Sequence, residues 1–185
     1  MAIAEALCGI DQGAAWATGA ARFSSIIGNM VALTTEDRSQ TQLRAAYTMN
    51  NLAILVTVAG GTDTKTIRSR VNGVNGNLVV TTVTTTGLIE DTTNSDTLAS
   101  GDLVNWSVTN PLAGDTLTLR LIGCNLNGTA DQWPLGSCMV SVTQAVGLTT
   151  FAIPSVNVVT PATTENDVRY TYRVGVTLTN LRSFH

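Results

Sequence analysis

Apolar and polar residues alternate along most of the chain from about residue 41 onward. A period of two places successive side chains on opposite faces of a strand, so this pattern predicts β-strands with one buried face. The predicted strands are residues 52–58, 67–72, 78–86, 102–109, 116–122, 139–146 and 168–178. Asn72-Gly73 and Asn75-Gly76 follow one another between two of these runs, and such dipeptides favour the positive φ angles of a tight hairpin. We therefore predict a hairpin between the second and third strands.

Strands that are apolar on one face must cover that face with another layer. Two antiparallel sheets packed face to face do so economically. We therefore expect an all-β fold, an antiparallel β-sandwich that is jelly-roll-like. A closed barrel is the structural alternative, because alternation alone does not reveal whether the outer edges meet.

Residues 1–40 differ from the rest of the chain in composition, because small residues dominate and apolar side chains are scattered. We expect an N-terminal extended arm over residues 1–40, with a lead-in strand near 22–27, followed by one β-sandwich domain over residues 41–185. The start of the chain has no basic region and carries Glu5 and Asp11, which is unlike a signal peptide. The expectation is synthesis in a cytoplasm without export.

Composition supports the all-β prediction and excludes several partners. Among 185 residues there are 30 Thr and 19 Val, which favour strands, and only 12% are charged. With 10 basic residues against 13 acidic ones, the chain has no positive field to attract nucleic acid. No run approaches the roughly 20 apolar residues that span a bilayer, so no membrane partner is expected.

Candidate catalytic chemistry is sparse. The one histidine is the last residue, His185, so the sequence does not supply the histidines that an ordered His-based triad or a multi-His metal site requires. The one lysine is Lys65, and the carboxylates are spread over predicted turns without a distinguishable pair. We predict that the protein is not an enzyme, with no catalytic residue and no cofactor.

An acidic segment at residues 90–96 groups oxygen ligands of the kind that calcium prefers. Asp91, Asn94 and Asp96 are the weak candidate ligands. The segment lacks the glycine and terminal glutamate spacing of an EF-hand. A solvated turn held by side-chain hydrogen bonds is the favoured interpretation.

Three cysteines, Cys8, Cys124 and Cys138, are an odd number and do not form a disulfide framework. A disulfide between Cys124 and Cys138 would close the loop 125–137. Their opposite strand faces and the expected cytoplasmic synthesis favour free thiols instead. Cys8, in the expected arm, is a candidate for crosslinking between subunits.

Four further residues are candidates for an interface or a ligand. Trp133, followed by Pro134, could present an aromatic platform to a sugar or another subunit, unless it only pins its own loop. Arg68 and Arg70 share an outward strand face and could pair with acidic groups of a neighbour, although a solvated face is the default. Trp16 is the aromatic candidate of the expected arm.

Several short patterns follow one another between residues 51 and 108. They are Asn51-Leu52, Val71-Asn72-Gly73, the Val/Thr strand 78–82, the segment 91–95, and Gly101-Asp102 with Val104. In this order they resemble a β-sandwich module of structural proteins of tailed bacteriophages. These residues belong to turns and strand entries, so the resemblance bears on fold more than on activity.

The resemblance implies a virion structural protein, foremost a capsid decoration protein (cement or head protrusion) on the outside of the shell. Its partners would be the major capsid protein or other virion proteins, and it would form a homo-oligomer, with a trimer favoured. The alternative is a tail-fibre-type receptor- or carbohydrate-binding module, with Trp133 and loop residues Asn125, Asn127 and Asp131 meeting the ligand. A glycan hydrolase ranks lowest. The expected location is the virion, after synthesis in the host cytoplasm.

Overall fold

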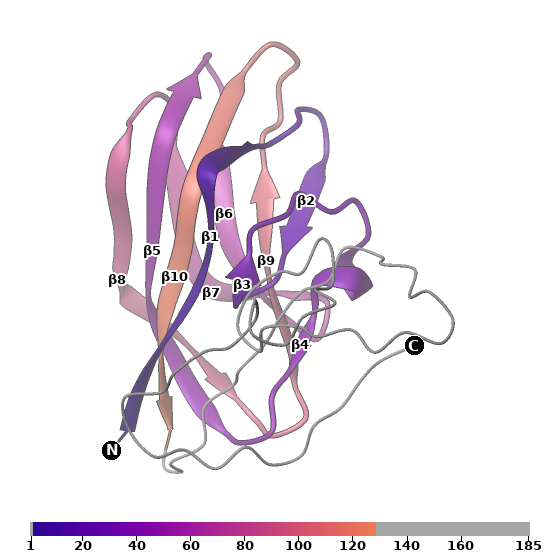
Figure 1. The fold of residues 1–185 in the computed structure, drawn as a ribbon, viewed down its shortest axis with the longest axis vertical. Coiled ribbons are helices and arrows are strands. Elements are labelled where there is room, and N and C mark those ends of the chain that lie inside the picture. The colour runs from indigo at the N-terminus through magenta and orange to yellow at the C-terminus, as the bar shows by residue number, and fades with distance from the viewer. Residues whose placement is uncertain (1, 129–185) are drawn as a thin grey trace, which may run out of the picture.

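The computed structural model describes residues 2–128 (Figure 1). The elements are β1 (Ala2–Ala15), β2 (Ala21–Ser24), β3 (Gly28–Asn29), the 3-10 helix η1 (Glu36–Ser39), β4 (Thr41–Gln42), β5 (Tyr47–Gly60), β6 (Lys65–Val71), β7 (Val74–Thr82), β8 (Gly87–Leu98), β9 (Leu103–Thr109) and β10 (Thr116–Gly128). Within this range no helix has the length and apolar character needed to cross a membrane. The strands predicted at 139–146 and 168–178 lie outside the described residues.

The strands form two separate sheets. Sheet A has the order β3-β1-β10-β5-β8, and sheet B has the order β2-β9-β6-β7, with the short β4 also paired to β9. Neighbouring strands run antiparallel, except for the brief parallel contact between β1 and β3. Figure 1 shows β8, β5, β10 and β1 side by side in front of β6, β7 and β9. The prediction of an all-β antiparallel sandwich is confirmed, because the strands of residues 2–128 form two separate sheets.

The core lies between the two sheets and is built from the alternating apolar residues. Side chains predicted to face inward are buried on β5, β9 and β10: Leu52, Ile54, Val56, Val104, Trp106, Val108, Leu117 and Leu119. Trp106 is the largest fully buried side chain. Burying a large apolar side chain contributes about 1.5–3 kcal/mol, so this shared layer is the main source of stability.

Bulges change which face some residues occupy. On β10, Leu119 pairs with Val56 but Leu121 pairs with Leu55, so one extra residue separates them. A bulge shifts the side-chain parity of everything beyond it. Leu121, predicted to face inward, is therefore only half-buried, and Ile122 enters the core instead.

Residues 2–40 belong to the sandwich rather than to an extended arm. β1 lies between β3 and β10, and its partner register with β10 runs from Ala2 opposite Gly128 to Ala15 opposite Thr118. After it, Trp16, with Ile26 and Met30, is buried in the core. This corrects the predicted arm, because small residues form an inward face without the bulky alternation that marks the later strands.

The Asn72-Gly73 turn is confirmed. Asn72 has φ 51° and Gly73 has φ 77°, and the flanking Val71 and Val74 pair directly, as in a two-residue type I′ hairpin. Asn75-Gly76 is not a second turn, since both residues lie within β7. A Cβ on Gly76 would come within 2.3 Å of the Ser69 hydroxyl, so glycine is needed there for close approach between β6 and β7.

Candidate functional site

The acidic segment is part of strand β8 rather than a separate turn. Asn50 pairs with Ser95, but Leu52 pairs with Asp91, so residues 92–94 of β8 bulge outward opposite Asn51. Asn51 itself has φ 52°, a left-handed conformation that asparagine tolerates. The hydrogen-bonded turn that the sequence predicted is therefore a bulge within an edge strand.

Asp91 holds this bulge in place. Its Oδ1 accepts hydrogen bonds from the backbone N–H groups of Thr93 and Asn94, both at 3.1 Å. Its Oδ2 accepts from the backbone N–H of Val79 at 3.0 Å and from the side-chain amide of Asn94 at 2.9 Å. Burial alone would raise the pKa of Asp91, but these donated hydrogen bonds outweigh it and hold the pKa well below its usual range.

Asp96 plays a similar part further along β8. Its Oδ1 accepts from the backbone N–H of Asn77 at 2.6 Å, and its Oδ2 accepts from the Ser69 hydroxyl at 2.5 Å. Calcium requires oxygen atoms that face the ion, whereas these carboxylates face N–H and O–H donors. Among the described residues no group of three or more His, Cys, Asp or Glu side chains could hold a metal ion. Asp91 and Asp96 therefore brace β8 of sheet A against sheet B, and Asn94 supports Asp91 within the bulge.

A second brace joins the β6–β7 hairpin to the β8–β9 turn. The Asn72 side chain donates to Asp102 Oδ1 at 2.8 Å and accepts from the backbone N–H of Leu103 at 2.9 Å. Asp102 Oδ2 accepts from the backbone N–H of Ala99 at 2.7 Å. The hydrogen bond from Asn72, followed by that from Ala99, lowers the pKa of Asp102. Residues of the phage-like pattern thus connect turns of the sandwich.

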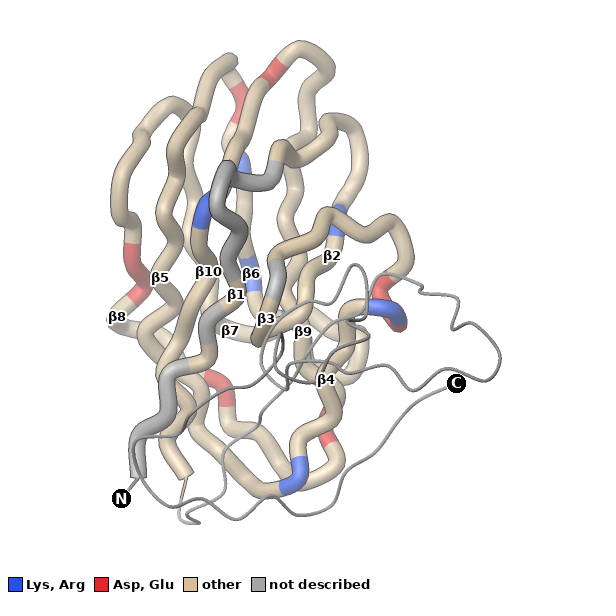
Figure 2. The backbone as a smooth tube through the Cα atoms, viewed as in Figure 1, with Lys and Arg blue, Asp and Glu red and all other residues tan. Residues whose placement is uncertain are grey.

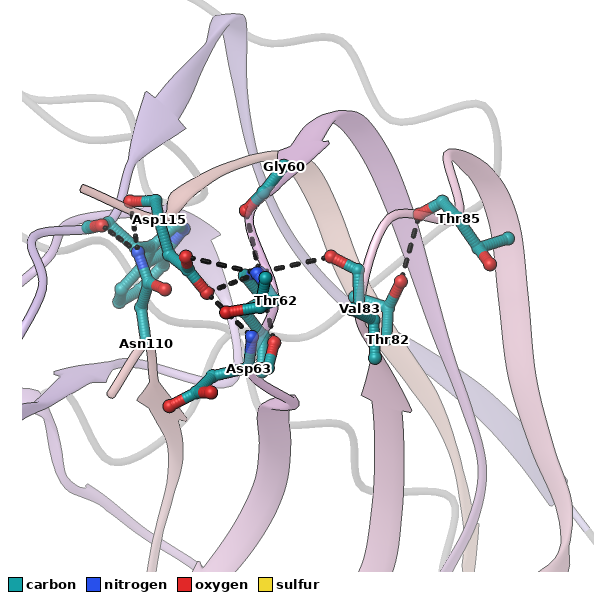
Figure 3. A network of polar contacts seen from close by, with 10 residues as sticks. Gly60, Thr62, Asp63, Thr82, Val83, Thr85, Asn110 and Asp115 are labelled. Atoms are coloured by element: carbon teal, nitrogen blue, oxygen red, sulfur yellow. Dashed lines mark hydrogen bonds and ion pairs between the residues drawn. The ribbon is translucent and has the colours of Figure 1, made fainter. Parts of the chain in front are cut away.

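Among the described residues, the most developed polar cluster surrounds Lys65, and sequence reasoning missed it. Figure 3 shows its labelled members Gly60, Asp63, Val83 and Asp115. Lys65 is fully buried, and its Nζ donates to the carbonyl oxygens of Gly60, Asp63 and Val83 at 2.6–3.0 Å. It also forms an ion pair with Asp115 Oδ2 at 2.8 Å. One feature of the sequence indicated that Lys65 is buried: it lies on the same face of β6 as Ile67 and Ser69.

Asp115 connects this lysine to the β5–β6 loop. Its two oxygens accept from the backbone N–H groups of Thr62 and Asp63 at 3.2 and 3.0 Å. The hydrogen bond from Lys65 is the main cause of the lowered pKa of Asp115. Gly61 has φ 102°, and a Cβ there would overlap the Asp115 carboxylate, so the loop must contain glycine. The pair is enclosed by its own loops and serves the fold.

Asn110 extends the cluster toward the N-terminal segment. Its side-chain amide donates to the carbonyl oxygens of Trp16 and Asp115 at 3.1 and 3.2 Å. Trp16 was a candidate for an interface, but it is only 3% exposed and packs in the core. The backbone carbonyl of Trp16 attaches the end of β1 to Asn110 in the β9–β10 loop.

Arg70 makes its contacts within the chain. Its guanidinium pairs with both carboxylate oxygens of Glu36 at 2.9 Å, and it also donates to Asn75 and to the carbonyl of Gly73. It lies 6.0 Å from the centre of the Phe23 ring. These contacts hold η1 against the outer face of sheet B, so Arg70 acts here as a structural anchor rather than as a free interface residue.

Arg68 lies on the same outer face, half-buried between Ser107 of β9 and Val79 of β7. Its buried Nε has no hydrogen-bond partner among the described residues. The pairing of Arg68 with an acidic neighbour therefore stays a prediction. Elsewhere charged residues are sparse over the strands (Figure 2).

The described cysteines are buried free thiols. Cys8 is fully buried on β1, and burial raises the pKa of its thiol to about 12, partly offset by a hydrogen bond with Ser24. Burial also raises the pKa of Cys124. A protonated, enclosed thiol is a poor nucleophile, which corrects the prediction that Cys8 crosslinks subunits. The loop predicted at 125–137 begins later than expected, because Asn125 and Asn127 lie within β10 and pair with β1 and β5. The rest of that loop, with Trp133, Cys138 and the disulfide alternative, lies outside the described residues.

The described residues therefore define a two-sheet β-sandwich in which the buried charged groups brace strands and loops. Scans against protein-family models, curated proteins and solved structures each found no match to this chain.

Proposed function

We propose that this chain is a structural component of a phage virion, foremost a capsid decoration protein bound to the outside of the shell. The observation that carries the proposal is the placement of the residues that resemble the phage module. Asn72, Asp91 and Asp102 all hydrogen-bond between neighbouring strands or turns. The resemblance therefore rests on residues that maintain the architecture of such a module.

The order of the strands supports a jelly-roll version of the sandwich. The strands β1-β10-β5-β8 face β2-β9-β6-β7, and most consecutive connections cross from one sheet to the other. Jelly rolls with two such four-stranded sheets occur in viral capsid and lectin domains. A fold hosts many functions, so this likeness supports the proposal only by analogy.

We further propose that the protein is not catalytic and needs no cofactor. Within residues 2–128 the buried carboxylates are Asp91, Asp96 and Asp115, and each accepts two or more hydrogen bonds from the chain. A glycosidase needs one carboxyl group that gives a proton and another that faces the sugar. Carboxylates committed to backbone N–H groups favour a building block over a hydrolase.

The proposed partners are the major capsid protein and further copies of this chain, with a homotrimer favoured. On the outer face of sheet A, Leu88, Leu55 and Leu121 lie in one row across β8, β5 and β10. Leu88 is 61% exposed. Leu55 and Leu121 are half-buried, so the row is apolar and partly exposed. Such a row on a sheet face is a candidate surface for another subunit to cover.

Substitution of Leu88 by glutamate is expected to dissociate the oligomer, because it places a charge in the middle of a buried contact. Light scattering after size exclusion should show the mass fall from that of the oligomer to that of one chain. Val74→Glu is the matched control, since Val74 is 66% exposed on the hairpin of sheet B. Equal masses for wild type and Leu88→Glu would contradict the assigned face.

The proposed function itself is tested by co-sedimentation with empty capsids of the same phage. A decoration protein should saturate the shells at a ratio set by capsid symmetry and should ignore cell-surface glycans on an array. Binding to glycans without binding to capsids would instead favour the receptor-binding module. Binding to neither capsids nor glycans would contradict both the decoration-protein and the receptor-binding proposals.

A further inference from the structure

Among the strands of residues 2–128, β7 is the outer one of sheet B, and one side of its backbone has no partner among these strands. An open edge of this kind can pair with a strand from another chain. Proteins commonly protect such edges with lysine, proline or very short strands. β7 is nine residues long and contains neither lysine nor proline.

The absence of charge extends well beyond β7. From Val71 to Ile89 the chain has no Asp, Glu, Lys or Arg, and it is rich in Val and Thr. Val74 is 66% exposed and Val83 is 38% exposed. High β-propensity without charge or proline is the composition of segments that join into extended sheets.

Two carboxylates of β8, in sheet A, contact the edge of β7 in sheet B. Two backbone N–H groups of β7, those of Asn77 and Val79, donate to the carboxylates of Asp96 and Asp91 on β8 at 2.6 and 3.0 Å. In return the Asn77 side chain donates to the carbonyl oxygen of Ser95 on β8 at 3.0 Å. The facing edges of β7 and β8 are therefore joined by side-chain hydrogen bonds instead of by strand pairing.

We propose that Asp91 and Asp96 guard the edge of β7 against pairing with a strand of a second copy. Each carboxylate takes a backbone donor that an incoming strand would need, and each places a negative charge beside an otherwise uncharged strand. The bulge at residues 92–94 bends β8 away from regular pairing at the same corner. This protection of the β7 edge is inferred from the contacts between β7 and β8 alone and does not depend on the proposed function.

The test is the double variant Asp91→Asn with Asp96→Asn in the full chain, which keeps side-chain size and removes both charges. Hydrogen exchange of the Asn77 and Val79 amides should accelerate by about tenfold or more, because charge-assisted hydrogen bonds are lost. Light scattering and thioflavin fluorescence should then report growing β-rich assemblies in proportion to protein concentration. Asp102→Asn is the matched control, because Asp102 accepts from the Asn72 side chain and the Ala99 backbone and from no backbone amide of β7.

A lysine added at exposed Thr81 of β7 should restore the original oligomeric state to the double variant, since it returns charge to the edge. If the double variant shows no cooperative unfolding, the single variant Asp91→Asn decides by the same readouts. A folded variant with unprotected β7 amides and an unchanged oligomeric state would overturn the guard. Unchanged exchange at both amides would overturn it as well.

Discussion

Deletion of residues 1–40 is expected to abolish cooperative folding of the chain. The deletion removes β1 and so exposes the edge of β10 that β1 covers in sheet A. It also takes Trp16, Ile26 and Met30 out of the core. Each large side chain lost from a core costs about 2–5 kcal/mol, and the sum for three, about 6–15 kcal/mol, is as large as the typical stability of a whole domain. Circular dichroism and a urea titration of the truncated chain would measure this loss.

The control for the deletion is Trp16→Ala in the full-length chain. That variant keeps β1 and should lose about 3–5 kcal/mol while still unfolding cooperatively. A truncated chain that unfolds in one transition at the wild-type midpoint would show that β1 is dispensable, as an arm would be.

Replacement of Lys65 by methionine is expected to lower the free energy of unfolding by about 3–5 kcal/mol. Methionine has a similar length but no donor, so Asp115 would keep a buried negative charge without its ion-pair partner. The carbonyl oxygens of Gly60, Asp63 and Val83 would also lose their shared donor. Urea titration at neutral pH measures the change.

Arg44→Met provides the matched control, because it removes a positive charge from an exposed position. Its effect should stay within about 0.5 kcal/mol, as for most surface substitutions. Similar small losses for both variants would mean that Lys65 is solvated and that the cluster does not brace the loops.

The regular strands were predictable because their buried faces are made of bulky apolar residues. On β5, β6 and β9 the alternation of Leu, Ile, Val and Trp located the core side directly. β8 escaped detection since two of its inward positions are Asp91 and Asp96, which erase the alternation. β1 escaped because Ala6 and Cys8 are too small to mark a buried face.

The polar clusters were harder to predict because they depend on contacts between distant segments. Lys65 and Asp115 lie 50 positions apart, and nothing local to either residue indicates the partner. Bulges add a second difficulty, as Leu121 shows, because one inserted residue reverses the assignment of inner and outer faces. The Asn72-Gly73 turn and the hydrogen bonds of Asp91 to Thr93 and Asn94 were readable from the sequence, since their chemistry is local.

The opposite edge of sheet B is divided between two very short strands. β2 covers residues 106–109 of β9 and β4 covers residues 103–104, so this border consists of a four-residue and a two-residue piece. Neither piece offers a continuous template for an incoming strand. Addition of a further strand to sheet B is therefore disfavoured at this border, and a second copy that approaches this side would have to make contact through side chains or loops.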